Sequence, residues 1–175
     1  METKAAITAH ERNCILLLGT TALIQCGHML EHVVQVVQWM VRMQLSHGII
    51  GSLDLELVHF IYDGLFLIGL SALGSFYGDV LRAKGAKPYA VFATAWGVQT
   101  YHMIEHVVKF SQHMETGIEG TPGILGRYLP VIPLHFTINL IVTTCIVLPF
   151  FMLGMHRAFV RAILPRFAAK PSRQA

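Results

Sequence analysis

The stretch QCGHMLEHVV at residues 25–34 places two histidines and a glutamate inside an apolar segment. The apolar segment around it, residues 14–40, is longer than the roughly 20 residues that a helix needs to cross a bilayer. An ionisable group within hydrocarbon is costly unless it is paired or coordinated, and such groups usually face the interior of a helix bundle. We therefore expect these side chains to serve a function inside a bundle.

The composition of the whole chain predicts an integral membrane protein. Of the 175 residues, 54% are hydrophobic and only 13% are charged, and the mean hydropathy is +0.55. These values are too apolar for an ordinary soluble domain. The sequence predicts an all-α fold, a bundle of four transmembrane helices. The predicted spans are about residues 14–40, 53–77, 89–108 and 129–155.

The stretch QTYHMIEHVV at residues 99–108 repeats the first one. His102 and His106 follow His28 and His32 by the same 74 positions (102 − 28 and 106 − 32). The pattern predicts an internal repeat of two tandem parallel helical hairpins, related by a pseudo-twofold axis along the membrane normal. The predicted repeats are residues 1–82 and residues 83–175, the latter with a basic C-terminal tail. Two further pairs of segments match: GIIG at 48–51 with GILG at 123–126, and LVHFIYD at 57–63 with PLHFTIN at 133–139.

Helical spacing gathers the polar residues of each repeat on one face. Positions i, i+3 and i+4 share a helix face, so each repeat carries a stripe of Gln, His, Glu and His on its first helix. The second helix of each repeat carries a histidine followed one turn later by Asp or Asn. Because a helix rises about 1.5 Å per residue, Asp63 is expected at the depth of His32, and His59 one turn nearer the outer surface. The predicted metal ligands are His28, Glu31, His32, His59, His102, Glu105, His106 and His135. The residues predicted to orient them are Gln25, Asp63, Gln99 and Asn139.

Six imidazoles and two carboxylates indicate a transition-metal centre, either dinuclear or a pair of sites. Imidazole suits zinc, copper, iron and nickel, and iron or copper is preferred here over zinc. The predicted function is a redox enzyme, or a subunit of a membrane oxidoreductase or monooxygenase complex. Because the chain has little extramembrane area for a soluble electron donor, a partner subunit or a quinol would supply the electrons.

The motifs HMLEH at 28–32 and HMIEH at 102–106 resemble sequences of known metalloenzymes. They resemble the histidine boxes of membrane desaturases and alkane hydroxylases, with glutamate in place of one histidine. The pairing of a carboxylate and a histidine three residues apart on two helices is similar to the four-helix di-iron proteins, although the order here is His-x-x-Glu. These resemblances imply an iron-dependent oxygenase. The same motif is similar to the inverzincin proteases, which implies zinc and a glutamate that activates water.

Other functions remain open at the level of sequence. A bis-histidine haem b could bridge two helices, with Gly27, Gly64 and Gly97 making room for the porphyrin. The chain could also be a non-catalytic subunit of a membrane complex that binds or delivers metal. Finally, the polar residues could form only interhelical hydrogen bonds.

Basic residues predict the orientation of the chain in the membrane. They gather between the second and third predicted spans and after the fourth, so both termini are expected to be cytoplasmic and the metal cluster to lie in the outward half of the membrane. The basic tail is expected to contact anionic lipid headgroups rather than nucleic acid. Expected partners are the lipid bilayer, other membrane subunits and a quinol or other lipid-soluble substrate. The basic residues in question are Arg82, Lys84, Lys87, Arg157, Arg161, Arg166, Lys170 and Arg173.

Overall fold

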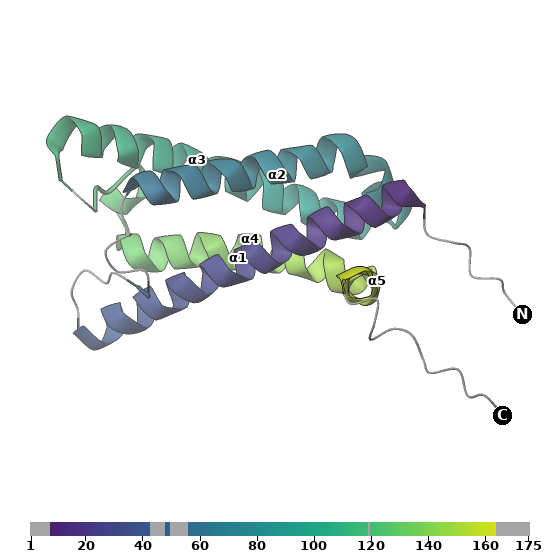
Figure 1. Ribbon diagram of the computed structural model, residues 1–175. Coiled ribbons are helices and arrows are strands. Elements are labelled where there is room, and N and C mark those ends of the chain that lie inside the picture. The colour runs from purple at the N-terminus through teal and green to yellow at the C-terminus, as the bar shows by residue number, and fades with distance from the viewer. Residues whose placement is uncertain (1–7, 43–47, 50–55, 119, 164–175) are drawn as a thin grey trace, which may run out of the picture.

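The computed structural model describes residues 8–42, 48–49, 56–118 and 120–163 (Figure 1). Within these ranges the regular structure is entirely helical, which confirms the predicted all-α class. The described residues form five α-helices and one short 3₁₀ helix. They are α1 (Ala9–Arg42), α2 (Glu56–Ala83), α3 (Ala86–Thr116), η2 (Leu125–Arg127), α4 (Val131–Met152) and α5 (Met155–Ile163).

The four long helices lie side by side in a bundle (Figure 1). α3 packs between α2 and α4, and α1 packs on α4 and crosses it at an angle. Of the contacts between neighbouring long helices, those between α1 and α2 are the sparsest. α5 packs against α1 and α4, at the end of the bundle where α1 begins. The seam between α1 and α2 is therefore the loosest side of the bundle.

The interior of the bundle has an apolar part and a polar part. The apolar core includes Leu18, Leu73 and Ile146, each at most 1% exposed, and the α5 residue Phe159 packs against it. Toward the opposite end, fully buried side chains include Gln25, Asp63, Gln99, His102 and Glu105. The polar residues predicted to face the interior of the bundle thus lie in one layer, which we call the polar layer. It lies at the end near the loops that join α1 to α2 and α3 to α4.

Three helices are long and apolar enough to cross a membrane: α1 over Ala9–Val41, α2 over Glu56–Ala83 and α4 over Val131–Met152. The predicted third span, residues 89–108, lies within α3, which has 31 residues but does not meet the same criterion within the described ranges. The predicted fourth span is shorter than expected, because the chain turns at Gly154 (φ 64°) between α4 and α5.

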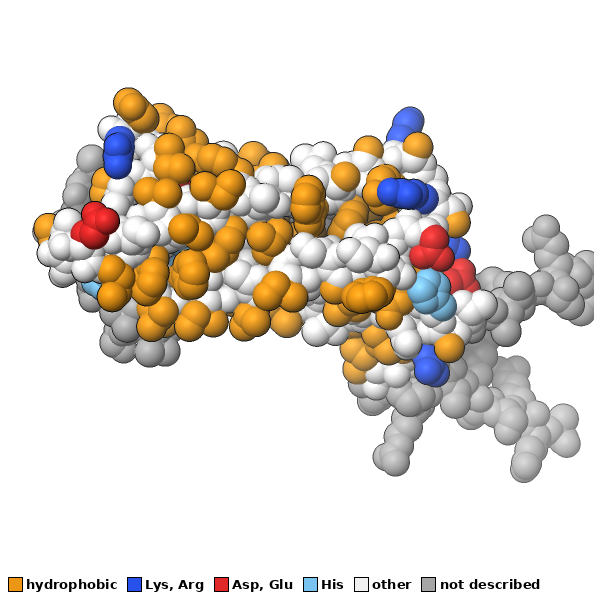
Figure 2. Space-filling model, turned by 90° about the horizontal axis from the view of Figure 1, so that it is seen from above, with side chains coloured by type: hydrophobic (Ala, Val, Ile, Leu, Met, Phe, Trp, Pro, Cys, Tyr) orange, Lys and Arg blue, Asp and Glu red, His pale blue; other side chains and the backbone are white. Residues whose placement is uncertain are grey.

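The outer surface of the bundle is widely apolar. In Figure 2, hydrophobic side chains cover the flank of the molecule, and Lys, Arg, Asp and Glu gather near its two ends. Leu23, Leu65, Ile68 and Phe76 are each 60–70% exposed. Apolar patches of this extent on a protein surface mark contact with membrane or with other proteins. The surface is compatible with a location in the membrane.

Candidate metal centre

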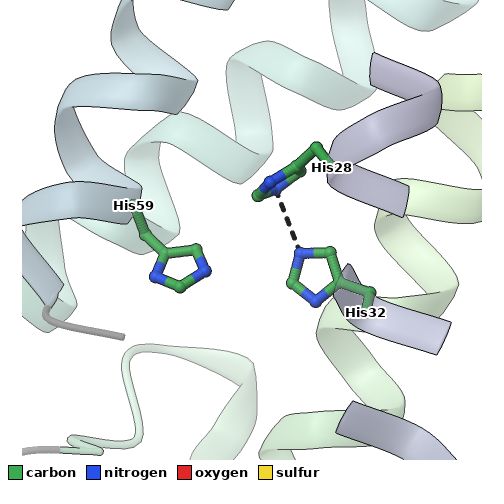
Figure 3. Close-up of side chains that lie close together, drawn as sticks. All are labelled: His28, His32 and His59. Carbon is green, nitrogen blue, oxygen red and sulfur yellow. Dashed lines mark hydrogen bonds between the residues drawn. The ribbon is translucent and has the colours of Figure 1, made fainter. Parts of the chain in front are cut away.

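Two groups of three histidines lie in the polar layer. The first triad is His28 and His32 on α1 with His59 on α2, and the second triad is His102 and His106 on α3 with His135 on α4. Within each triad, one potential ligand atom per residue lies within 4.8 Å of the others. Figure 3 shows the first triad, whose rings approach a common space from two helices. The structure thus brings all six predicted histidine ligands together, as two sets of three.

The spacing of the histidine nitrogens suits a shared metal ion. The Nε2 atoms of His28 and His32 are 3.0 Å apart, and those of His102 and His106 are 3.1 Å apart. Two nitrogens that bind one tetrahedral metal at about 2.0–2.1 Å lie about 3.4 Å from each other. Each pair is therefore within a few tenths of an ångström of ligand spacing.

The two triads are neighbours. The rings of His59 and His106 stack with their centroids 5.8 Å apart and their planes 5° from parallel. His59 belongs to the first triad and His106 to the second, so one ring of each triad forms the boundary between them. Two metal ions bound here would form a close pair.

The second triad is the more deeply buried of the two. Its three histidines are all buried, whereas in the first triad only His32 is buried and His28 and His59 are partly exposed. Nδ1 of His135 is 2.9 Å from the Val131 carbonyl oxygen, and its Nε2 is buried without a hydrogen-bond partner among the described residues. Buried polar atoms nearly always have a partner, so this nitrogen, beside two other imidazoles, fits the role of a metal ligand.

The four predicted orienting residues form two matching pairs. Nε2 of Gln25 donates to Oδ1 of Asn139 over 3.0 Å, joining α1 to α4. Nε2 of Gln99 donates to Oδ1 of Asp63 over 2.8 Å, joining α3 to α2. All four side chains are fully buried. The amides therefore link helices of different hairpins, and Asp63 also contacts the second triad.

Both predicted glutamate ligands accept hydrogen bonds from loop backbone. Oε2 of Glu31 accepts the N–H of Ile49 at 2.9 Å. The carboxylate of Glu105 accepts the N–H groups of Ile124 and Leu125 at 2.8 and 2.7 Å. These contacts anchor the loops over the polar layer. Metal ligation by the two glutamates stays a prediction, since the histidines form the triads without them.

Backbone conformation and close contacts explain why both loops carry glycine at matching positions. Gly48 and Gly123 both have φ of +71°, where side chains are strained. A Cβ at Gly123 would lie 2.9 Å from Cγ of Lys109, and one at Gly48 would collide with the Glu31 carboxylate. The backbone N–H groups of Gly48 and Gly123 also donate to Gln38 and Gln112. Close approach of the loop backbone to the carboxylates therefore requires glycine.

Two residues beside the first triad were not predicted from the sequence. Oε1 of Gln35 lies 2.8 Å from Nδ1 of His32. The ring of Tyr62 stacks on that of His28 with centroids 4.2 Å apart. Each follows a triad histidine of its own helix by three positions (Gln35 after His32, Tyr62 after His59), and this spacing was a signal available in the sequence.

An ion pair takes the place of Gln35 in the second half of the chain. Lys109 follows Gln35 by the 74 positions that separate the repeated motifs (109 − 35). Its Nζ lies 3.1 Å from Oε1 of Glu56, and the two side chains are 7% and 8% exposed. The pair joins α3 to the start of α2 next to the second triad.

The glycines considered for a porphyrin do not open space between the histidines. Gly27 and Gly97 are exposed, and a Cβ added at either would meet nothing within 4 Å, so both lie on the outer surface. A Cβ at Gly64 would contact the Met103 side chain at 3.6 Å. The prediction that Gly27 and Gly97 make room for haem is wrong, because their side of the helix faces away from the bundle.

No protein-family model, curated protein or solved structure matches this chain. The chemistry must therefore be inferred from the site. Three imidazoles that converge from two helices are a recognised ligand set for zinc, copper, iron or nickel. Both triads could hold such an ion.

Proposed function

We propose that the protein is a membrane metalloprotein that binds two transition-metal ions, one in each histidine triad. The observation that carries this proposal is the convergence of three histidines within 4.8 Å of one another, twice in one bundle. Without metal ions, the six imidazole rings of the two triads would lie close together in a largely apolar protein. Coordination would give the buried Nε2 of His135 a partner that the described side chains do not supply.

The first triad favours copper, whereas the second triad also suits iron. Non-haem iron sites typically combine histidine with carboxylate; Asp63 lies at the second triad, while both predicted glutamates accept loop N–H groups. Imidazole ligands suit copper in either oxidation state. Copper and iron each change oxidation state by one electron, whereas zinc does not. Two such ions side by side therefore favour a redox role over a hydrolytic one.

The proposed redox role is the oxidation of a quinol from the bilayer. One quinol would lose two electrons and two protons to become a quinone, with the protons released to water at the membrane surface. Two one-electron metal ions, one held by His28, His32 and His59 and one by His102, His106 and His135, would supply the two electron acceptors, and a redox subunit of a larger membrane complex would be the final acceptor. The contact of His59 with His106 supports this role, because it places the two electron acceptors next to each other.

Haem is less well supported than two separate metal ions. The Nε2 atoms of His28 and His32 are 3.0 Å apart on one helix and approach the same space. The axial ligands of a haem bind from opposite faces of the macrocycle, so these two nitrogens would not serve one haem.

We further propose that α3 also spans the membrane and that the chain is a tandem repeat of two hairpins. Equivalent contacts support the repeat: Gln25–Asn139 matches Gln99–Asp63, Glu31–Ile49 matches Glu105–Ile124, and Gln38–Gly48 matches Gln112–Gly123. The start of α1 lies at the same end of the bundle as α5. In the proposed topology this end is cytoplasmic, and the triads lie in the outward half of the membrane.

Elemental analysis of the detergent-purified full chain tests the proposal. We expect about two equivalents of copper or iron per chain after reconstitution of the metal-free protein with copper(I) or iron(II), and an optical spectrum without porphyrin bands. Binding of zinc but of neither redox metal would overturn the redox role and keep the metal sites. Failure to bind any of the three metals would overturn the function.

Replacing Glu31 and Glu105 with glutamine tests whether the glutamates are ligands. We expect the double variant to keep both metal ions and to melt at a lower temperature, because hydrogen bonds to a neutral amide are weaker than those to a carboxylate. Metal content and thermal unfolding of the same preparation check this. Loss of metal at an unchanged melting temperature of the metal-free protein would place the glutamates in the ligand set.

A further inference from the structure

We infer that the two metal sites differ, and that neighbouring residues of α2 make them differ. Asp63 completes the second triad as a carboxylate ligand, giving a closed site. Tyr62 packs on the first triad, which keeps an open coordination position toward the seam between α1 and α2. This inference rests on the proposed function, since it assigns different roles to the two sites.

The contacts of Asp63 direct one of its oxygens to the second triad. Oδ1 accepts the amide of Gln99 at 2.8 Å and lies 3.4 Å from Nδ1 of His102. Oδ2 lies 3.2 Å from Nε2 of His106, the same nitrogen that faces His102 Nε2. A nitrogen and an oxygen bound to one tetrahedral metal are about 3.4 Å apart. Asp63 thus presents a carboxylate oxygen at ligand spacing from a triad nitrogen.

The corresponding position in the second half carries an amide. Asn139 follows Asp63 by the 76 positions that separate His59 from His135 (139 − 63 and 135 − 59). Its Oδ1 accepts the amide of Gln25 at 3.0 Å and its Nδ2 donates to the His135 carbonyl at 3.1 Å. Asn139 faces α1 as Asp63 faces α3, but it offers no negative charge to the first triad.

The first triad is partly exposed at the outside of the bundle. His28 and His59 are partly exposed and lie on α1 and α2, the least closely packed neighbours of the bundle. Tyr62 stacks on His28, and its hydroxyl donates to the Ile24 carbonyl at 3.2 Å. Its counterpart on α4 is the buried Ile138. A lipid-soluble molecule would therefore reach the first triad from the side of Tyr62.

The two ligand sets predict different chemistry. A site closed by four protein ligands retains its metal, whereas three histidines leave a position for substrate or solvent. The carboxylate also offsets one charge of a buried divalent cation, so the second site binds such an ion more tightly. The first site is then the reactive one, and it takes a small neutral donor or a phenol-like head group such as that of a quinol.

Titration of the metal-free full chain with cobalt(II) in detergent tests the inference. Ligand-field absorbance is expected to show a tight and a weak site, each holding one ion. His135→Ala should remove the tight site and His59→Ala the weak one. Asp63→Asn should weaken the tight site at least tenfold and the weak site by much less. The isosteric amide keeps the acceptor for Gln99, so this variant is expected to fold.

A second substitution keeps the test decisive if Asp63→Asn is unstable. Asn139→Asp places a carboxylate toward α1 and should tighten the weak site by a similar factor. Equal affinities in the wild-type protein, or unchanged affinities in both variants, would overturn the inference and leave the two-metal function standing. Failure of the wild-type chain to bind cobalt, copper or iron would instead overturn the proposed function.

Discussion

Replacing His106 with alanine is expected to remove one of the two bound metal ions and to leave the other in place. His106 belongs to the second triad, whereas His28, His32 and His59 form the first triad without it. Metal content should therefore fall from about two ions per chain to about one. His32→Ala should give the same stoichiometry by emptying the first triad, and mass spectrometry of the purified variants measures both.

His113→Ala is the matched control for these variants. His113 lies on α3, and its Nδ1 is 2.9 Å from the carbonyl oxygen of Ile118, outside both triads. It should retain two ions. If His106→Ala and His32→Ala each lost both ions, the histidines would form one shared centre and the assignment of two sites would be wrong.

Of the proposed substitutions, Lys109→Met is expected to lower the free energy of unfolding the most. Lys109 and Glu56 form a buried ion pair over 3.1 Å. Removal of one partner leaves the other charge buried and uncompensated, which costs about 3–5 kcal/mol. The free energy of unfolding of the metal-free protein, measured by denaturant titration in mixed micelles, should fall by about this amount.

The double variant Lys109→Met/Glu56→Gln separates the loss of the pair from the loss of one charge. It should recover most of the stability, because neither charge remains buried alone. Lys84→Met is the exposed control: Lys84 and Glu11 are 45% and 33% exposed at 3.6 Å, so little change is expected. Equal stability of Lys109→Met and Lys84→Met would show that the buried pair contributes nothing.

The sequence predicted the helices and the direction of their polar faces because both depend on local spacing. The i, i+3, i+4 rule placed Gln25, His32 and Gln99 inside the bundle, and all three are buried. Counting residues outward from the loop placed Asp63 at the depth of His32 and His59 one turn nearer the outer surface, which predicted that they could join one cluster. Helical rise is nearly constant, so depth was predictable.

The lateral arrangement of the helices was not predictable in the same way. Whether the histidines form one cluster or two depends on which helices are neighbours, and periodicity does not encode this. The partners of Glu31 and Glu105 are backbone N–H groups, which every non-proline residue carries, so no letter of the sequence marks them. The ion pair of Lys109 likewise joins helices that are distant in sequence.

The division of contacts between and within the hairpins has a consequence for biosynthesis. Each triad is built from a single helical hairpin, whereas the Gln25–Asn139, Gln99–Asp63 and Lys109–Glu56 contacts join one hairpin to the other. The first hairpin therefore already carries all three histidines of its triad before the second hairpin is synthesised. If the triads bind metal as proposed, loading of the first site can precede docking of the two halves, and docking then brings the Asp63 carboxylate to the second triad.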